Sequence, residues 1–220
     1  MAKKKVIIRQ TYTDKSIESV ILDGQDRVGT SLLDESWLQG SAFLYSLYGE
    51  QFALECSSAA QEVRSKYLPK NPRPEYDIYF ASRQGYPFCA IGVAKTDGPW
   101  FKQYSYYTAN ASDGCYTMYE IGLGMQGLRY PIFRDGIQVA VICKRGQDFD
   151  NLDTYEIIAT SDRAVIMAVT LSMYLDADSF LRGGHVFKHT HYEGSYTTKT
   201  YYLTTNAGIM AHYNPDFERI

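Results

Sequence analysis

Residues 164–175, with the sequence AVIMAVTLSMYL, are apolar almost all the way round a helix. They lie inside the longer segment Thr160 to Phe180, in a chain whose other segments have the pattern of short strands. A helix without a polar stripe must be covered by protein on every side. The segment therefore predicts a mainly β fold, a closed antiparallel β-barrel around one central hydrophobic α-helix.

Local signals support this helix. Thr160 or Ser161 can cap its N-terminus, and Asp162 complements the positive end of the helix dipole. The apolar run is long for a strand and normal for a helix, and it is shorter than the ~20 residues that span a bilayer, so no transmembrane segment is predicted. We expect Asp176 and Asp178, and then Gly183-Gly184, to mark the helix end. A core helix packed against one sheet is the alternative arrangement.

The remaining sequence has the turns of an antiparallel β structure. Asp-Gly pairs, which favour tight hairpin turns, occur at residues 23–24, 97–98, 113–114 and 135–136. Short runs of β-branched and aromatic residues lie between the turns and predict strands. These runs are 76–81, 86–93, 101–108, 116–123, 128–133, 137–144 and 154–159. The clearest hairpin turns at Asp135-Gly136.

Composition limits the class of protein. The 220 residues include no linker-like tract and no fixed repeat, so we expect a single domain over residues 1–220. The net charge of -3 at pH 7 lacks the excess of Lys and Arg that general nucleic-acid binding needs. The only basic run, Lys3 to Lys5, is expected to be a solvated chain end. The apolar segment after it is too short for a signal peptide, so we expect a cytoplasmic protein.

The four cysteines are predicted to be small, buried and reduced side chains. They include no C-x-x-C pair, and no histidine lies beside them at the spacing of zinc ligands. Cys89 and Cys143 lie among strand-type residues, as expected for core positions. This usage agrees with a reducing compartment.

Several features follow one another between residues 75 and 180. They are the hairpin at Asp135-Gly136, the strand 154–159 with Tyr155 and Ile157, and the apolar helix that reaches Asp176. This order resembles the tubby C-terminal-like superfamily, which includes the LURP-one-related proteins and the phospholipid scramblases. The resemblance implies a closed barrel threaded by a hydrophobic helix. Residues 181–220 follow the helix and are predicted to be a C-terminal extension that adds strands or packs outside the barrel.

The resemblance also implies a surface that binds lipid headgroups, because tubby-type domains bind phosphoinositides through exposed Lys and Arg. The best local basic cluster combines Lys144 and Arg145 at a strand end with Lys66, Lys70 and Arg73 in a loop. An ordinary solvated surface is the alternative interpretation of these charges.

A second candidate site is rich in histidine. His185, His189 and His191 fall within seven residues, and on a strand their odd numbering places them on one face. His189 and His191 would then lie about 7 Å apart, close enough to share a metal ion. Neutral imidazoles suit zinc, copper or nickel, and Glu193 can complete such a site. A polar, outward-facing strand is the alternative.

Two functions of different class follow from the sequence. The first is a non-enzymatic binding or scaffold protein on a tubby-like barrel, without a cofactor, that meets phospholipid headgroups or a protein partner. The alternative is a metal-dependent enzyme that uses the histidine-rich strand. A barrel filled by side chains leaves little room for a ligand inside, so we expect the first function to use the outer face or the loops.

Overall fold

The computed structural model describes residues 2–12, 16–33, 43–56, 79–97, 103–124, 126–144, 152–183, 202–204 and 206–219. The strands are β1 Lys4–Tyr12, β2 Ile17–Asp23, β3 Asp26–Leu33, β4 Phe43–Leu47, β5 Glu50–Cys56, β6 Tyr79–Arg83, β7 Tyr86–Lys95, β8 Ser105–Ala111, β9 Gly114–Met118, β10 Ile121–Gly124, β11 Leu128–Arg134, β12 Ile137–Lys144, β13 Thr154–Ala159 and β14 Tyr202–Leu203. The helices are α2 Asp162–Gly183, α3 Ala207–Met210 and the short 3-10 helix η2 Pro215–Glu218.

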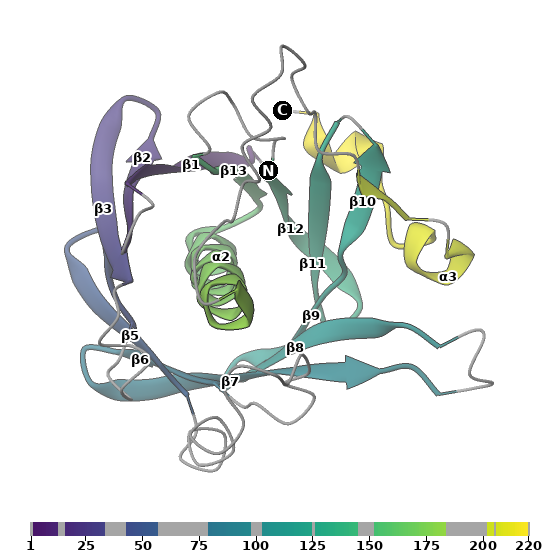
Figure 1. Cartoon of the computed structure of the whole chain (residues 1–220), viewed down its shortest axis with the longest axis horizontal. Helices are drawn as coiled ribbons and strands as arrows, with labels where there is room; N and C mark the ends of the chain where they lie inside the picture. Colours follow the sequence, from purple (N-terminus) through teal and green to yellow (C-terminus); the bar gives the residue numbers. More distant parts are fainter. Residues whose placement is uncertain are drawn as a thin grey trace.

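Twelve of these strands, β1 to β9 and β11 to β13, form a closed ring of antiparallel pairs. The ring closes because β12 pairs with β11 on one side and with β13 on the other. Closure leaves these strands without free edges. Helix α2 runs through the ring and is seen nearly end-on in Figure 1. The predicted fold class, a closed antiparallel barrel around one central hydrophobic helix, is confirmed.

Helix α2 begins as its sequence predicts and is covered on every side. The backbone N–H of Ala164 donates to Ser161 Oγ at 3.2 Å, so Ser161 is the N-cap. From Ala164 to Asp178 every side chain is buried except that of Ile166, which is half-buried. Even the hydroxyls are satisfied, because those of Thr170 and Ser172 donate to carbonyls four residues earlier, at 2.8 and 2.9 Å.

The helix ends at the first of the two expected glycines, but Asp176 and Asp178 do not mark its end. Helix α2 continues to Gly183, and both Asp176 and Asp178 lie inside it as buried residues. Two acids near a helix C-terminus are unfavourable to the helix dipole, but contacts with the barrel wall override this local preference. For Asp176 the contacts are hydrogen bonds from Gln10 and Tyr155, described below.

The N-terminus also differs from the expectation of a solvated end. Strand β1 begins at Lys4 and lies between β2 and β13 in the ring. Lys4 forms an ion pair with Asp162 at the start of α2, and Lys5 forms one with Glu156 at 2.8 Å. Lys5 therefore lies on the outer face, whereas Lys4 lies on the same side of the strand as Val6, which fills the core, and its ammonium meets the start of the helix.

The hairpin between β11 and β12 confirms its prediction. Asp135 and Gly136 have φ values of 49° and 83°, and two positive φ angles are what a tight two-residue turn of this hand requires. Asp135 tolerates this conformation better than most residues do. The turn sets the register in which Pro131, which has no N–H to donate, lies opposite Val141.

The described part of the C-terminal extension lies outside the ring. Strand β14 pairs with β10, and α3 and η2 follow it along the outer wall (Figure 1). Among the described residues, no helix is both long and apolar enough to span a membrane.

Two of the cysteine predictions are confirmed and one is wrong. Cys89 and Cys143 are buried thiols, at 5% and 6% exposed. Cys115 is free but exposed, because it lies on the outer face of β9 beside the turn from β8. The side chain of Cys56 is outside the described part of the structure.

The fold predicts a strong dependence on the volume of the helix side chains. Leu171 is 1% exposed inside the ring, so Leu171→Ala leaves a cavity that rigid barrel walls cannot close. We expect a loss of roughly 2–5 kcal/mol in the free energy of unfolding, measured by urea denaturation. Ile137→Ala, at a residue that is 72% exposed, is the control and should change stability by less than about 0.5 kcal/mol. Equal losses in the two variants would contradict the central position of the helix.

Candidate functional site

The described structure places one residue of the predicted basic cluster. Lys144 lies on the inner face of β12, its side chain is only 14% exposed, and its Nζ is 2.6 Å from Asp153 Oδ2. The other predicted site residues, Arg145, Lys66, Lys70, Arg73, His185, His189 and His191, lie outside the described residues. The predicted lipid patch and metal site therefore stay predictions, and the ammonium of Lys144 serves the interior of the barrel.

Lys144 belongs to an interior polar cluster with Gln10, Asp153, Tyr155 and Asp176. Gln10 links the wall to the helix, because its Oε1 accepts from the Asp153 N–H at 2.9 Å and its Nε2 donates to Asp176 Oδ1 at 3.3 Å. The Tyr155 hydroxyl donates to the same Asp176 oxygen at 2.5 Å. The Lys144 ammonium lies 5.2 Å from the centre of the Tyr155 ring. Strands β1, β12 and β13 thus hold one carboxylate of helix α2.

The cluster buries more negative than positive charge. Asp153 and Asp176 are 1% and 3% exposed, and Lys144 is the cation that faces them among the described residues. Asp176 Oδ2 and Asp153 Oδ1 have no hydrogen-bond partner in the described structure. The contact between Lys144 and Asp153 Oδ2 is an ion pair by distance but lacks hydrogen-bond geometry. A buried carboxylate oxygen without a partner is costly, which favours a bound proton.

The pKa values agree with this accounting. Burial raises the pKa of Asp176 to about 6, although the Lys144 charge and the hydrogen bonds from Tyr155 and Gln10 oppose the shift. Burial and the neighbouring Asp176 raise the pKa of Tyr155 well above its ordinary value, so its hydroxyl stays a donor. Since Oδ1 of Asp176 already accepts two hydrogen bonds, Oδ2 is the oxygen that takes the proton. The cluster is a buried polar network that joins the helix to the wall.

Sequence reasoning missed this cluster because it treated Asp176 as a helix-end residue. The available signal was an acid that follows an apolar run with no glycine or proline between them. Within the described residues, no three His, Cys, Asp or Glu side chains are grouped in a way that could hold a metal ion.

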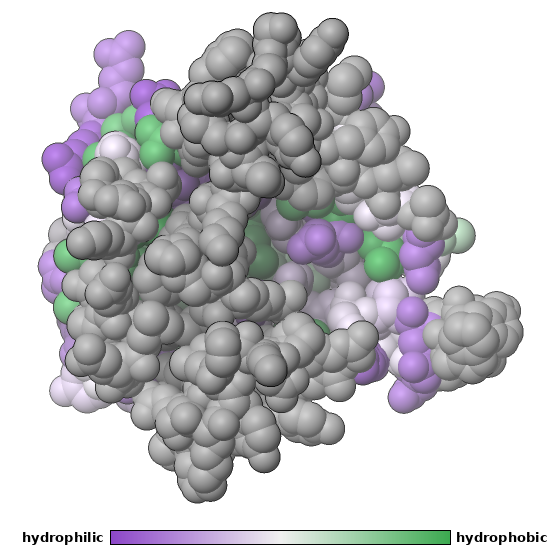
Figure 2. All heavy atoms as spheres, in the orientation of Figure 1, coloured by the Kyte–Doolittle hydropathy of each residue, from purple (hydrophilic) through white to green (hydrophobic). Residues whose placement is uncertain are grey.

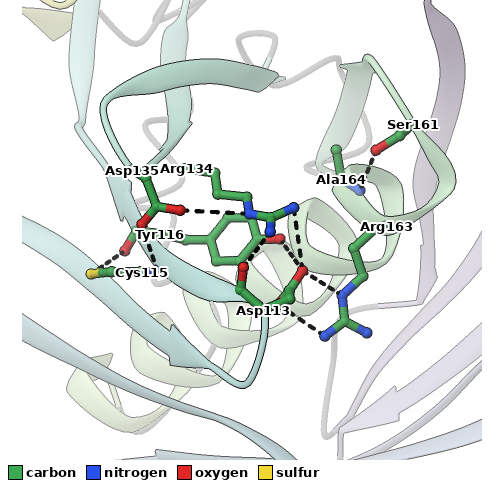
Figure 3. A network of polar contacts seen from close by, with 8 residues as sticks. All are labelled: Asp113, Cys115, Tyr116, Arg134, Asp135, Ser161, Arg163 and Ala164. Carbon is green, nitrogen blue, oxygen red and sulfur yellow. Dashed lines mark hydrogen bonds and ion pairs between the residues drawn. The ribbon is translucent and has the colours of Figure 1, made fainter.

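A second polar network, drawn in Figure 3, holds the start of helix α2. Asp113, in the turn between β8 and β9, accepts two hydrogen bonds from Arg163, at 2.9 and 3.0 Å. Its carboxylate also accepts from the Tyr116 hydroxyl at 2.8 Å and lies 3.6 Å from the guanidinium of Arg134. The hydrogen bonds from Arg163 hold the pKa of Asp113 below its ordinary value. Because both carboxylate oxygens are engaged, this network is a structural clamp rather than an open site.

The outer wall carries a groove across strands β1 to β5. It has a volume of about 430 Å³, which lies in the range of small-molecule sites. The groove is lined by Thr11, Glu18, Ser19, Val20, Arg27, Thr30, Ser31, Leu32, Leu44, Tyr45, Ser46 and Gln51. Leu32 and Leu44 are cross-strand partners and are 48% and 57% exposed. We call this feature the outer groove.

The outer groove contains charges that are not neutralised by close neighbours. Among the described residues, neither Glu18 nor Arg27 forms an ion pair, and both side chains are exposed. Hydroxyls lie beside them, and those of Thr30 and Ser46 are 3.2 Å apart across the β3–β4 pair. The groove thus offers one cation, one anion, hydroxyls and an apolar surface together. Figure 2, in the orientation of Figure 1, shows hydrophilic and hydrophobic residues interspersed where the described residues are visible.

The interior cluster predicts that stability depends on pH through Asp176. The pKa of Asp176 is about 6 in the folded state and 3.8 ordinarily. Between pH 3.8 and pH 6 the folded state therefore binds more protons at Asp176 than the unfolded state does, so the free energy of unfolding falls as the pH rises through this range. Asp176→Asn keeps the two hydrogen bonds to Oδ1 and stays neutral. We expect this variant to exceed the wild type by on the order of 3 kcal/mol near pH 7.5 and to match it near pH 4, in urea denaturation.

The control for this prediction is Asp26→Asn, at an exposed acid on β3, which should show no such gain. If Asp176→Asn is no more stable than the wild type near pH 7.5, burial does not raise the pKa of the Asp176 carboxyl group.

A comparison of the chain with protein-family models, curated proteins and solved structures finds no match. The function is therefore argued from the geometry of the chain itself.

Proposed function

We propose that this protein is a non-enzymatic binding protein whose barrel is a rigid scaffold and whose outer groove binds a zwitterionic phospholipid headgroup. The observation that carries the proposal is the presence of Arg27 and Glu18 in one groove with two exposed leucines. Within the described structure neither charge has an ion-pair partner. Such a surface is complementary to a ligand that carries both charges and an apolar tail.

The chemistry of each part of the ligand has a counterpart in the groove. A guanidinium forms paired, charge-assisted hydrogen bonds with a phosphate, which is the role of Arg27. The carboxylate of Glu18 suits the amine of the same headgroup. Leu32 and Leu44 then lie against the glycerol and the first methylenes, whose burial stabilises the complex by about 0.8 kcal/mol per methylene.

The charge of the whole chain also favours a headgroup of zero net charge. At -3, the protein is weakly repelled by a strongly anionic membrane surface, whereas a zwitterionic surface has no such effect. The basic cluster predicted from the sequence is not needed for this mode of binding. The filled interior supports the proposal as well, since it leaves the outer wall for ligands.

Membership of the tubby C-terminal-like superfamily is part of the same proposal. It is supported by the closed ring, by the hydrophobic helix inside it and by the inward, buried positions of Tyr155 and Ile157. The metal-dependent enzyme has no comparable support, because its histidines lie outside the described residues.

Vesicle sedimentation tests the proposed function. We expect the protein to bind vesicles of phosphatidylcholine and phosphatidylethanolamine, without a requirement for anionic lipid. Arg27→Gln should weaken binding about tenfold or more, because a charge-assisted hydrogen bond contributes about 1.5–3 kcal/mol. Leu44→Ser should weaken binding as well. Soluble phosphoethanolamine should compete better than inorganic phosphate, since only the former also meets Glu18.

Two control variants test whether lipid binding belongs to the outer groove. Arg9→Gln removes an exposed arginine that does not line the groove, and Ile137→Ser removes an exposed apolar residue on β12. Both should bind vesicles like the wild type. The proposal fails if the groove variants bind like their controls, or if binding occurs only when anionic lipid is present.

A further inference from the structure

A patch of apolar side chains lies on the outer face of the ring, away from the central core. Val141 and Cys143 of β12 and Ile158 of β13 face outward, yet they are only 2%, 6% and 2% exposed. Pro131, opposite Val141 on β11, is buried on the same side. Outward positions of a barrel wall ordinarily face water, so this burial requires a cover. In the described structure the side chain packed on the patch is Phe217 of η2.

Polar contacts place Phe217 on this patch. The Lys3 ammonium donates to the carbonyl oxygens of Phe217 and Arg219, at 2.7 and 2.9 Å, and lies 4.6 Å from the centre of the Phe217 ring. Glu218 Oε1 accepts from Arg129 Nε at 2.9 Å. The wall thus holds an aromatic residue followed directly by an acid, together with the backbone around them. We call it the β11–β13 surface.

A second contact holds the same segment further along the wall. The His212 ring stacks on the Tyr119 ring with centroids 3.6 Å apart and planes 5° apart, and its Nε2 lies 3.2 Å from the Tyr104 hydroxyl. Burial lowers the pKa of His212. The contacts at His212 and Phe217 together bind residues 206–219 to the outside of the barrel.

This segment is held much more lightly than the barrel it covers. Strand β14 has two residues, and neither α3 nor η2 has a buried residue. Segments with few buried contacts open locally at a lower free energy than a barrel core does. The cover can therefore leave the β11–β13 surface while the ring stays folded.

We propose that the β11–β13 surface is a docking site for a protein segment that carries an aromatic residue followed by an acid, and that residues 206–219 occupy it in cis. The occupant shows the chemistry of the partner: an aromatic ring between Val141 and Ile158, and a carboxylate at Arg129. A partner binds by displacing the chain's own segment. This surface is separate from the outer groove and does not depend on the proposed lipid binding.

Binding of a labelled synthetic peptide with the sequence of residues 206–220 to the full chain tests the proposal. In the wild-type chain the attached segment competes with the peptide for the β11–β13 surface, at an effective concentration on the order of 1 mM. Binding of the peptide to the wild-type chain should therefore be weak. Phe217→Ala in the full chain removes the anchor of the attached segment. Fluorescence anisotropy should then show at least about tenfold tighter binding of the wild-type peptide. Glu218→Arg, at a half-buried side chain of the attached segment, should act in the same direction if Phe217→Ala does not fold.

Charge reversal identifies the surface. Adding Arg129→Glu to the Phe217→Ala chain should weaken its binding of the wild-type peptide. A peptide that carries Glu218→Arg should bind this double variant with the affinity recovered. Ile137→Ala in the full chain is the control and should bind the peptide like the wild type. The proposal is overturned if the peptide binds the Phe217→Ala and Glu218→Arg chains no more tightly than the wild type. It is also overturned if charge reversal brings no recovery.

Discussion

The rest of the structure depends on the burial of helix α2 on all sides. An amphipathic helix can rest on one sheet, but a helix with buried Val165, Met167 and Met173 on different faces cannot. A closed ring is the arrangement of strands that covers such a helix completely and leaves no strand edges. Once the helix fills the ring, the inner surface is committed to packing. Binding surfaces must then lie on the outer wall or at the ends of the barrel.

Apolar packing alone does not fix the height or rotation of this helix, because the hydrophobic effect has no direction. Polar contacts fix the height and rotation of the helix at two levels of the barrel. Arg163 meets Asp113 at the start of the helix, and Asp176 meets Gln10 and Tyr155 in its second half. Buried polar groups cost desolvation, but in some proteins they select one register among several of similar energy. Here each contact joins the helix to a different part of the wall.

The elements that follow local rules could be predicted from the sequence. The apolar run predicts helix α2, and Asp135-Gly136 predicts the β11–β12 hairpin. The partners of the polar contacts could not be predicted, since Gln10 is 166 residues from Asp176 and Asp113 is 50 residues from Arg163. Periodicity carries no information about such distant pairs. The outer groove and the cover at Phe217 were missed for the same reason, because each exists only after several strands have assembled.

Strand β1 joins the three polar or exposed regions of the molecule. Next to its first residue, Lys3 holds the carbonyl oxygens of the C-terminal segment, and further along Gln10 bonds to Asp176 inside the ring. The next residue, Thr11, lines the outer groove. A single strand can do this because successive side chains point to opposite faces of the wall. The composition of the basic N-terminus suggests a loose end, but strand β1 pairs with a neighbour on both sides. The contacts of its polar side chains hold it as well. Strand β1 therefore helps to position other parts of the molecule, in addition to contributing apolar side chains to the core.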